Sequence, residues 1–507
     1  MRIKKPLAVV LAILLLTTSV LSILFVASSL KAKDDAPTAA LGGTAKYVFV
    51  FIGDGMSASQ IHSAEILSEK LGGSDQIGLG RMAFTQFPSV GFMTTYDAES
   101  FIPDSASAAT AMFTGNATLG GVVNMDTTKT QEFTIISELA KAAGYKIGTI
   151  TTVSIDHATP ACFYAKQASR SDYYNIGLQL VSGDFDFFGG GGFVYPEGKE
   201  GDEESLIEIA KKNGFTVPAN KEEILALDAG SGKVLAINPV LFDDAAMLYE
   251  IDRLNHAPES LSLAQIVEKG IEVLDNDDGF LMMVEGGKVD WACHANDAAA
   301  AFHDIMAMDD AIKVALTFAE KHPDDTLIVV TGDHETGGLS IGYAATGTST
   351  YFEKLLCQTM SYVKFDELVA GMREEQALFD KAFEAVNEYF GLIAPDAPEA
   401  AEESNAGMVL SEREYQLLKD AYALSLKPAD ERDLNENQQL LYGTYEPFSM
   451  ACTHTLNNKA GISWSTYAHS GVPLPVFAKG VGAEAFAGSY HNTDIFHKLV
   501  SAMGLAQ

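Results

Sequence analysis

The stretch from Lys46 to Ile52, KYVFVFI, decides the predicted fold, and it runs directly into Gly53-Asp54-Gly55. A short run of β-branched and aromatic residues is typical of a buried strand, and the two glycines predict a tight loop after it. The same arrangement recurs at 280–284 (FLMMV) and at 326–330 (TLIVV), each followed by glycine and acidic residues. The sequence therefore predicts several strands that end in similar loops.

Helical stretches separate these strands, among them 135–143 and 298–321. Strands that alternate with helices favour an α/β fold, here a three-layer α/β/α sandwich around a central, mainly parallel sheet. In such sheets the reactive groups collect beyond the carboxyl ends of the strands. We therefore expect the functional residues in the loops that follow the three strands.

The region 344–460 has a different composition. It contains acidic amphipathic stretches at 365–390 and 410–426, a segment rich in Pro, Ala and Glu at 394–399, and few strand signals. We interpret it as a largely helical insertion between two core strands. The catalytic domain is predicted to cover 44–507, with this insertion inside it.

The first residues have the layout of an export signal. Met1 to Lys5 is basic, 7–30 is almost wholly apolar, and the chain turns polar from Lys31. This pattern predicts that 1–32 is a signal peptide or, because the apolar stretch is long enough to span a bilayer, an N-terminal membrane anchor. We expect an exported protein that is periplasmic, extracellular or anchored facing outside.

The overall charge limits the partners. The chain carries 34 Lys and Arg against 68 Asp and Glu, a formal net charge of −34. Nucleic acid and anionic membrane surfaces would be repelled, so neither is an expected partner. An anionic substrate would need strong positive charge at its site.

Four cysteines, Cys162, Cys293, Cys357 and Cys452, are too few to be the framework of a chain of this length. In an oxidising compartment Cys357 and Cys452 are the more plausible pair. Two free buried thiols are the alternative.

Acidic residues and histidines follow the predicted strands. Asp54 and Glu285 each follow one strand, and Asp333 with His334 follows another. Taken singly, such acids are also compatible with ordinary turns. Carboxylates that converge repel one another unless cations hold them, and Asp with His in a glycine-rich loop suits a zinc-like ion.

Asp290 and His294 lie four residues apart in Asp290-Trp291-Ala292-Cys293-His294. On a helix this spacing puts both side chains on one face, within reach of one metal ion. A surface pair without function is the alternative.

Ser105 lies in Pro103-Asp104-Ser105-Ala106-Ser107-Ala108, before a run of very small side chains. It can be the cap of an Ala-rich helix or a nucleophile at the helix start, where partial positive charge favours an anion. The two roles are compatible with each other.

Taken together, the motifs resemble those of the alkaline phosphatases. They occur in the family's order between residues 48 and 478 and cover nearly the whole chain outside the insertion and the N-terminal segment. The motifs are Gly53-Asp54-Gly55-Met56, Pro103 to Ala108, Asp156-His157-Ala158-Thr159-Pro160, Val284 to Gly287, Asp290 to His294, Thr331 to Glu335 and Ala468-His469-Ser470-Gly471.

The resemblance implies three metal sites, with two Zn²⁺ and one Mg²⁺ per chain. The ligands of one zinc site would be Asp290, His294 and His469. The ligands of the second would be Asp54, Asp333 and His334, joined during catalysis by the oxygen of Ser105. The ligands of the magnesium site would be Asp54, Thr159 and Glu285.

The resemblance also implies how phosphate is held. Arg170 matches the family's phosphate-binding arginine, with a surface salt bridge as its alternative role. His157 and Trp291 occupy positions that vary in the family around the magnesium and the phosphate. Because His157 lacks the negative charge of an acid, we expect weaker or more exchangeable magnesium; because Trp291 is no ammonium group, we expect weaker phosphate binding.

The implied activity is hydrolysis of small-molecule phosphate monoesters to an alcohol and inorganic phosphate through a phosphoserine at Ser105. Three divalent cations and Arg170, set against four carboxylates, would leave the site at about +3, which suits an anionic substrate. A homodimer is expected from the family. The alternatives are a phosphodiesterase or a substrate-restricted phosphatase of the same superfamily, and a binding protein with an inert metal site.

Overall fold

The computed structural model describes residues 44–74 and 76–506. The predicted export signal or anchor at 1–32 lies outside the described residues. Within the described part of the chain, no helix is both long enough and apolar enough to cross a membrane.

The stretch that decides the predicted fold forms β1 (Tyr47–Gly53), which is buried along its whole length. Its two neighbours are the other two predicted strands, β10 (Thr326–Gly332) and β9 (Phe280–Gly286), and both run parallel to it. The register sets Gly53 opposite both Gly332 and Gly286. The three loops predicted to carry function therefore meet at one edge of the sheet.

These strands are the centre of a ten-stranded sheet. Its order is β16 (Gly488–His491), β2 (Ser89–Thr94), β15 (Leu474–Gly480), β10, β1, β9, β3 (Lys146–Thr151), β4 (Phe187–Gly190), β6 (Lys233–Ile237) and β5 (Phe215–Thr216). Only β15, among the described strands of this sheet, runs against the others. The predicted mainly parallel sheet is confirmed.

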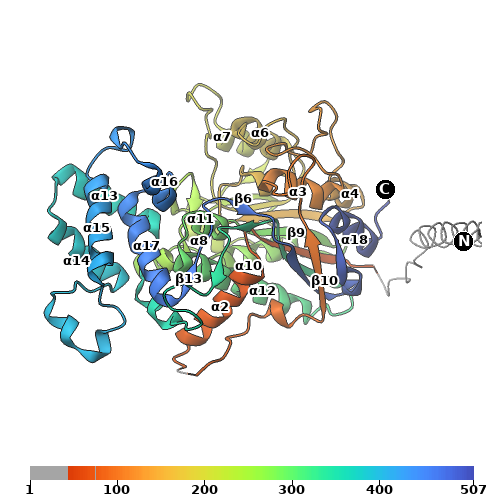
Figure 1. The fold of residues 1–507 in the computed structure, drawn as a ribbon. Helices are drawn as coiled ribbons and strands as arrows, with labels where there is room; N and C mark the ends of the chain where they lie inside the picture. The colour runs from red at the N-terminus through yellow and green to blue at the C-terminus, as the bar shows by residue number, and fades with distance from the viewer. Residues whose placement is uncertain (1–43, 75, 507) are drawn as a thin grey trace, which may run out of the picture. The chain divides into compact units, whose positions relative to one another are not determined.

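Helices cover both faces of the sheet (Figure 1). One face packs against α2 (Ala58–Leu71), α10 (Leu263–Leu274) and α12 (Ala298–Ala319). The other packs against α3 (Ser105–Thr114), α4 (Ile136–Ala142), α6 (Tyr173–Ser182), α7 (Leu206–Lys212) and α18 (Thr493–Met503).

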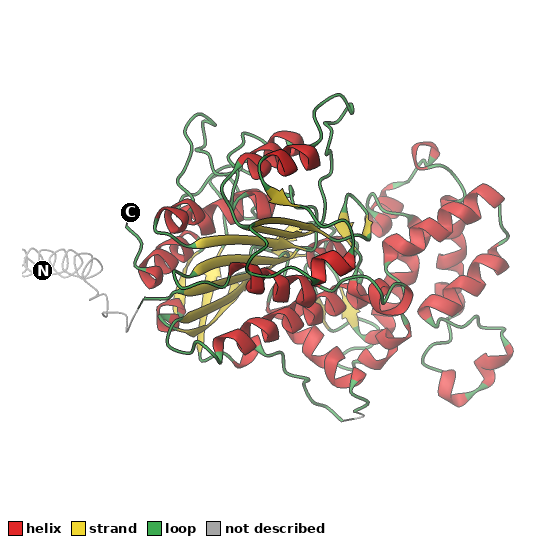
Figure 2. Cartoon of the chain, turned by 180° about the vertical axis from the view of Figure 1, so that it is seen from behind, coloured by secondary structure: helices red, strands yellow, loops and turns green. Residues whose placement is uncertain are grey.

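The apolar residues of β1 divide between the two faces. Phe49 and Phe51 belong to one core cluster, whereas Val48, Val50 and Ile52 belong to the other. This alternation follows from the two-residue period of a strand. Figure 2 shows the resulting three layers, a single sheet between two sets of helices, which confirms the predicted sandwich.

The region 344–460 is largely helical, as expected. Its helices are α13 (Tyr362–Glu375), α14 (Phe379–Phe390), α15 (Glu412–Ser425), α16 (Glu436–Tyr442) and α17 (Pro447–Ala460). They gather at one end of the sheet (Figure 1). The amphipathic stretch 365–390 is two helices and not one, because the chain turns left-handed at Gln376 (φ +50°).

The insertion leaves the sheet after β10 and returns before β15, which are neighbours. Its ends are closed by a two-stranded ladder of β12 (Ser340–Ile341) and β13 (Ile462–Ser463). Phe365 and Phe448 of the insertion belong to the same core cluster as α2, α10 and α12.

All four cysteines are free thiols, so the Cys357–Cys452 disulfide does not form.

Candidate active site

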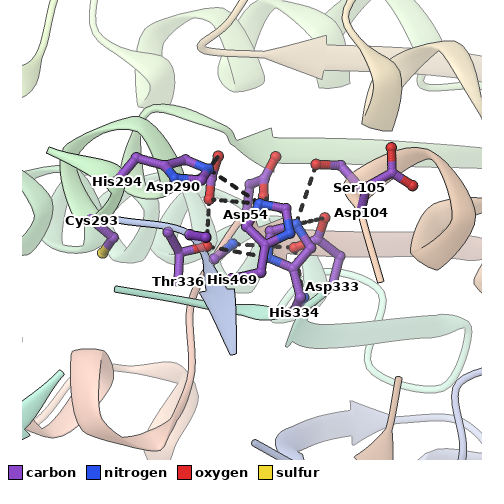
Figure 3. Close-up of polar contacts among 12 residues, drawn as sticks. Asp54, Asp104, Ser105, Asp290, Cys293, His294, Asp333, His334, Thr336 and His469 are labelled. Atoms are coloured by element: carbon purple, nitrogen blue, oxygen red, sulfur yellow. Dashed lines mark hydrogen bonds and ion pairs between the residues drawn. The ribbon is translucent and has the colours of Figure 1, made fainter. Parts of the chain in front are cut away.

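The loops after β1, β9 and β10 bring the predicted acidic residues together, as the register requires. Asp54, Glu285, Asp333 and His334 are all fully buried. Figure 3 shows Asp54, Asp290 and Asp333 converging with the three histidines His294, His334 and His469. Three groups of these side chains have ligand atoms within 4.8 Å of one another.

The first group consists of Asp290, His294 and His469, the set predicted for one zinc ion. Asp290 and His294 lie on α11 (Lys288–His294), with His294 Nε2 3.3 Å from Asp290 Oδ2. His469 lies on β14 (His469–Ser470), which pairs with β11 (Glu335–Thr336). The four-residue spacing therefore has the predicted effect, although the third member is 175 residues away.

The hydrogen bonds of the two histidines indicate what this group binds. Nδ1 of His294 lies 2.6 Å from the carbonyl oxygen of Tyr467, and Nδ1 of His469 lies 2.8 Å from that of Pro103. Each Nδ1 must donate its proton to reach a carbonyl, so each Nε2 keeps a lone pair. The two Nε2 atoms lie only 3.1 Å apart. Two lone pairs so close require a cation between them.

The pKa values of His294 and Asp290 also indicate that this group binds a cation. Burial opposes a proton on His294, but the Asp290 carboxylate outweighs it and raises the pKa of His294 to about 9. Burial likewise opposes the charge of Asp290, yet His294 and His469 lower the pKa of that carboxyl. Without a metal ion, a proton takes the position of the cation.

The second group centres on His334. Its Nε2 lies 3.3 Å from Asp54 Oδ1, 3.4 Å from Asp333 Oδ2 and 3.2 Å from the hydroxyl oxygen of Ser105. Asp54, Asp333 and His334 are the residues predicted for the second zinc ion. The group whose ligand atoms all lie within 4.8 Å of one another differs from this prediction, because it contains Asp54, Asp290 and His334 but not Asp333. Asp290 also lies within ligand distance of Asp54 and His334, so it stands between the first and second groups.

The third group differs from the predicted magnesium site in one respect. Asp54 and Glu285 are present, and Thr159 on α5 (Ala158–Ala161) is buried beside them, but His157 also places a nitrogen within ligand distance. The resemblance implies only oxygen ligands for the magnesium ion, with His157 at a neighbouring position. An imidazole in the donor set suits zinc better than magnesium, which prefers oxygen ligands.

Buried polar atoms without a partner support the presence of cations. Within the described chain, both carboxylate oxygens of Asp54, Asp333 Oδ2, Glu285 Oε1, Thr159 Oγ1 and His157 Nδ1 have no hydrogen-bond partner. Buried acceptors are rarely left unpaired in native proteins. Metal ions would satisfy all of these atoms, so the residues present fit the expected ions.

The pKa values of the same carboxyl groups are raised. Burial raises the pKa of Glu285 to about 8, and burial with the charge of Asp290 raises that of Asp333 to about 7. Burial and the charge of Asp333 also raise the pKa of Asp54 well above its ordinary value. Carboxylates that repel one another in this way stay ionised only beside cations.

Ser105 is the first residue of α3, and Asp104 is its N-cap. Asp104 Oδ1 accepts a hydrogen bond of 3.0 Å from the amide of Ser107. The structure thus assigns the cap to Asp104 and frees the Ser105 hydroxyl, which faces His334 (Figure 3). The Ser105 side chain is buried among the ligand groups with a residue exposure of 2 %.

Arg170 contacts Asp104, which precedes Ser105 in the chain. Its Nη1 donates to Asp104 Oδ2 at 2.9 Å, and its Nη2 lies 3.1 Å from His157 Nε2. The salt bridge with Asp104 is therefore part of the site and not a surface contact. Trp291 lies next to His157, with ring centroids 5.8 Å apart, so one variable position belongs to the third group and the other lies beside it.

Two residues of this site were not expected from the sequence. Glu335 and Thr336 are compatible with solvated turn residues in the sequence, yet both are buried. Thr336 Oγ1 donates to Asp290 Oδ1 at 2.5 Å and lies 3.2 Å from His334 Nδ1. It therefore contacts one side chain of the first group and one of the second.

Glu335 holds the segment that carries His469. Its carboxylate accepts from Gln60 Nε2 at 2.6 Å and from the hydroxyl of Ser470. Nothing in the local sequence distinguishes this glutamate from a turn residue, because its partners are far away in the chain.

A buried cluster of carboxylates and imidazoles at the strand ends of an α/β sheet defines a metalloenzyme. Comparison with known proteins is more specific. The family model for alkaline phosphatase matches residues 45–505. The chain belongs to the alkaline phosphatase family, which confirms the predicted fold and enzyme class and implies bound metal ions.

Individual relatives agree with this assignment. Alkaline phosphatase 3 of Bacillus subtilis (strain 168) is 30% identical over 473 residues, which cover 90% of this chain and 89% of that protein. A cold-active alkaline phosphatase from a psychrophilic Shewanella species has a similar structure, with a TM-score of 0.72 and 26% identity, covering 90% of this chain and 99% of that one.

A third relative is informative about metals. The alkaline phosphatase of the Antarctic bacterium TAB5, in a variant with histidine replaced by aspartate, has Mg bound in its M3 site. That structure matches with a TM-score of 0.61 and 26% identity, covering 92% of this chain and 100% of that one.

Proposed function

We propose that this chain hydrolyses phosphate monoesters to an alcohol and inorganic phosphate, with Ser105 as the nucleophile. The observation that carries the proposal is the position of the Ser105 hydroxyl, 3.2 Å from His334 Nε2 and at the start of α3. A helix N-terminus favours an anion at this place. No ligand or nucleophile of the expected set is missing, which argues against an inert binding protein.

The residues present would hold two zinc ions and one further ion. The zinc ligands would be Asp290, His294 and His469 in one group and Asp54, Asp333 and His334 in the other. The third ion, magnesium, would bind Asp54, Glu285 and Thr159, with His157 beside it. When bound, these ions supply the positive charge that lowers the pKa of the Ser105 hydroxyl and stabilises the leaving alcohol.

The chain's own residues orient the phosphoryl group. The Arg170 guanidinium, held by Asp104, can bind two of its oxygens at once, and such bidentate contacts are strong. Ser105 attacks phosphorus, the ester oxygen leaves with the alcohol, and a phosphoserine forms. Water then attacks the phosphoserine, so that phosphate is released and the Ser105 hydroxyl is restored.

The decisive test replaces Ser105 by Ala. Loss of the nucleophile should lower kcat for an aryl phosphate by about 10³-fold or more while the bound zinc content stays near two per chain. The matched control is Ser107→Ala on the same helix, whose hydroxyl faces Asp104 and which should retain most of the activity. Near wild-type activity of Ser105→Ala would contradict the mechanism.

A substrate-restricted phosphatase is the second candidate. Tyr362 and Tyr445 of the insertion line a cavity that also reaches His294, so the insertion contributes to the wall of the site. Rates on aryl monoester, diester and sulfate in one assay rank the alternatives. A diester rate above the monoester rate would favour a phosphodiesterase.

Export and assembly are further parts of the proposal. The basic start and apolar stretch of 1–32 support export or anchoring, and the family supports a homodimer. Activity confined to the cytosolic fraction of the producing cell, or a single-chain mass in light scattering, would contradict the respective part.

A further inference from the structure

A small cavity of about 210 Å³ adjoins the first zinc group. Its lining residues are Asp243, Asp244, Trp291, His294, Tyr362 and Tyr445. They come from three separate parts of the chain: the turn between β7 (Leu241–Phe242) and β8 (Ala246–Met247), helix α11, and the insertion. Two carboxylates and three aromatic rings thus surround one space beside a metal ligand.

The acidic turn is fixed in place. Asp243, Asp244 and Ala245 all have positive φ values, +36°, +49° and +60°, a conformation uncommon for residues other than glycine. The amide of Gly192 donates to the carbonyl of Ala245, and the amide of Met247 donates to that of Thr152, each at 2.8 Å. These bonds attach the turn to the ends of β4 and β3.

The carboxylates of this turn are not equally neutralised. Asp243 Oδ2 lies 3.8 Å from the buried Lys288 Nζ, which also lies 4.5 Å from the ring centroid of Trp291. Asp244 is exposed and has no hydrogen bond or ion pair with any residue that the structure describes. The cavity therefore keeps at its rim one carboxylate that no hydrogen bond or ion pair within the described chain neutralises.

The lining favours an organic cation over a metal ion. Asp243 and Asp244 belong to none of the groups with metal-ligand spacing in the described chain. Tyr362 and Tyr445 instead meet nearly at right angles, with centroids 5.9 Å apart, and Trp291 of α11 lines the same cavity. Aromatic faces attract quaternary ammonium groups, which shed water easily, whereas Mg²⁺ and Ca²⁺ need several oxygen ligands.

We propose that this cavity binds the quaternary ammonium group of a phosphate monoester of choline type while its phosphoryl group lies between Ser105 and Arg170. The inference rests on the proposed function. His294 lines the cavity and also belongs to the first zinc group, so one short substrate can reach both. The ester P–O bond breaks and water supplies the new oxygen and the protons, giving an amino alcohol and inorganic phosphate.

The test compares three substrates: phosphocholine, its neutral isostere 3,3-dimethylbutyl phosphate, and methyl phosphate, which is too short to reach the cavity. The two larger alcohols differ as leaving groups, so the readout is how a substitution changes the ratio of their kcat/KM values. Asp244→Asn and Tyr445→Leu should each lower the phosphocholine-to-isostere ratio by about 3- to 30-fold. The kcat/KM value for methyl phosphate should change by less than about twofold in either variant.

The matched control is Tyr445→Phe, which keeps the ring face and should keep the ratio. If the acidic turn only offsets the charge of the metal ions, Asp244→Asn will change the kcat/KM values of all three substrates by the same factor. That result overturns the inference. A wild-type protein that hydrolyses none of the three phosphate esters refutes the proposed function instead. In that case calorimetry decides: choline must bind more tightly than 3,3-dimethylbutanol, and equal binding overturns the inference.

Discussion

Thr336 shows how a single hydroxyl can organise two metal groups. It donates to Asp290 Oδ1, so it is left to accept from His334 Nδ1. That assignment puts the remaining lone pair of His334 on Nε2, toward Asp54 and Ser105. One hydroxyl therefore selects the tautomer of His334 and the orientation of Asp290.

Removing this hydroxyl should weaken zinc binding. Thr336→Val keeps the shape but leaves Asp290 and His334 without their shared partner, so zinc affinity should fall by about 10- to 100-fold. Competition with a chelating dye measures the effect. Thr336→Ser keeps the hydroxyl and should bind zinc like the wild type; a Val variant with unchanged affinity would show that Thr336 has no orienting role.

Arg170 and Asp104 are a second case at the scale of residues. Burial opposes the charge of Asp104, but Arg170 overcomes it and lowers the pKa of Asp104 to about 2. The sequence offered two roles for Arg170, phosphate binding and a salt bridge. The salt bridge is present, and it places the guanidinium 3.1 Å from His157 of the third group, while phosphate binding by Arg170 stays a prediction.

At the scale of elements, α12 carries a buried acid with consequences for stability. Asp304 is 5 % exposed and accepts a hydrogen bond of 3.1 Å from the amide of Glu250. Burial and the charge of Glu250 raise the pKa of Asp304 well above its ordinary value. The folded chain therefore holds a proton on this side chain that the unfolded chain releases near pH 4.

Because the folded state binds the extra proton, the contribution of Asp304 to the free energy of unfolding should fall as the pH rises above about 4. Asp304→Asn keeps the acceptor for Glu250 without the titration, so its stability relative to the wild type should increase with pH. Urea unfolding at several pH values checks this. Asp310→Asn, on the solvent side of the same helix, is the control; an equal pH trend in both variants would refute the role of Asp304.

The local sequence was most informative about where the strands and helices begin and end. The strands β1, β9 and β10 begin and end within two residues of their predicted ranges, because apolar β-branched runs bounded by glycine favour only one local structure. The boundary between α13 and α14 was missed. A left-handed Gln376 leaves no compositional signal comparable to Gly or Pro.

At the scale of the whole molecule, the three groups of candidate metal ligands are enclosed by the fold. They lie between β1, β9 and β10 on one side and the segment of β14 on the other. Three carboxyl groups of raised pKa, Asp54, Glu285 and Asp333, are enclosed there. Bound cations should therefore stabilise the folded chain and not only activate it.

Removing metals with a chelator should lower the Tm, and more so at pH 8.5 than at pH 6. At the higher pH the folded metal-free chain loses the protons that keep these carboxyls neutral, so their repulsion is no longer relieved. Differential scanning calorimetry with and without chelator measures the difference, and added Zn²⁺ and Mg²⁺ should restore the Tm. A Tm independent of chelator at both pH values would contradict the metal sites.

The sequence by itself determined the βα alternation, the loops that carry Asp54, Glu285 and Asp333, and the i, i+4 pair Asp290–His294, since each depends on residues close together in the chain. Its seven ordered motifs were also sufficient for the family. The strands, the loops and the spaced pair follow from local propensity and spacing, which are visible without a fold, whereas the family rests on the resemblance of the motifs to known sequences.

Only the tertiary structure decided which distant groups meet. It placed His157 in the third metal group, buried Glu335 and Thr336 among the ligands, and brought Tyr362 and Tyr445 of the insertion against His294. Each of these contacts joins segments that are far apart in the chain, so it depends on how the elements pack. A local pattern carries no information about such packing. For this physical reason the sequence placed His157 only near the magnesium, and it did not predict the contacts of the other four residues.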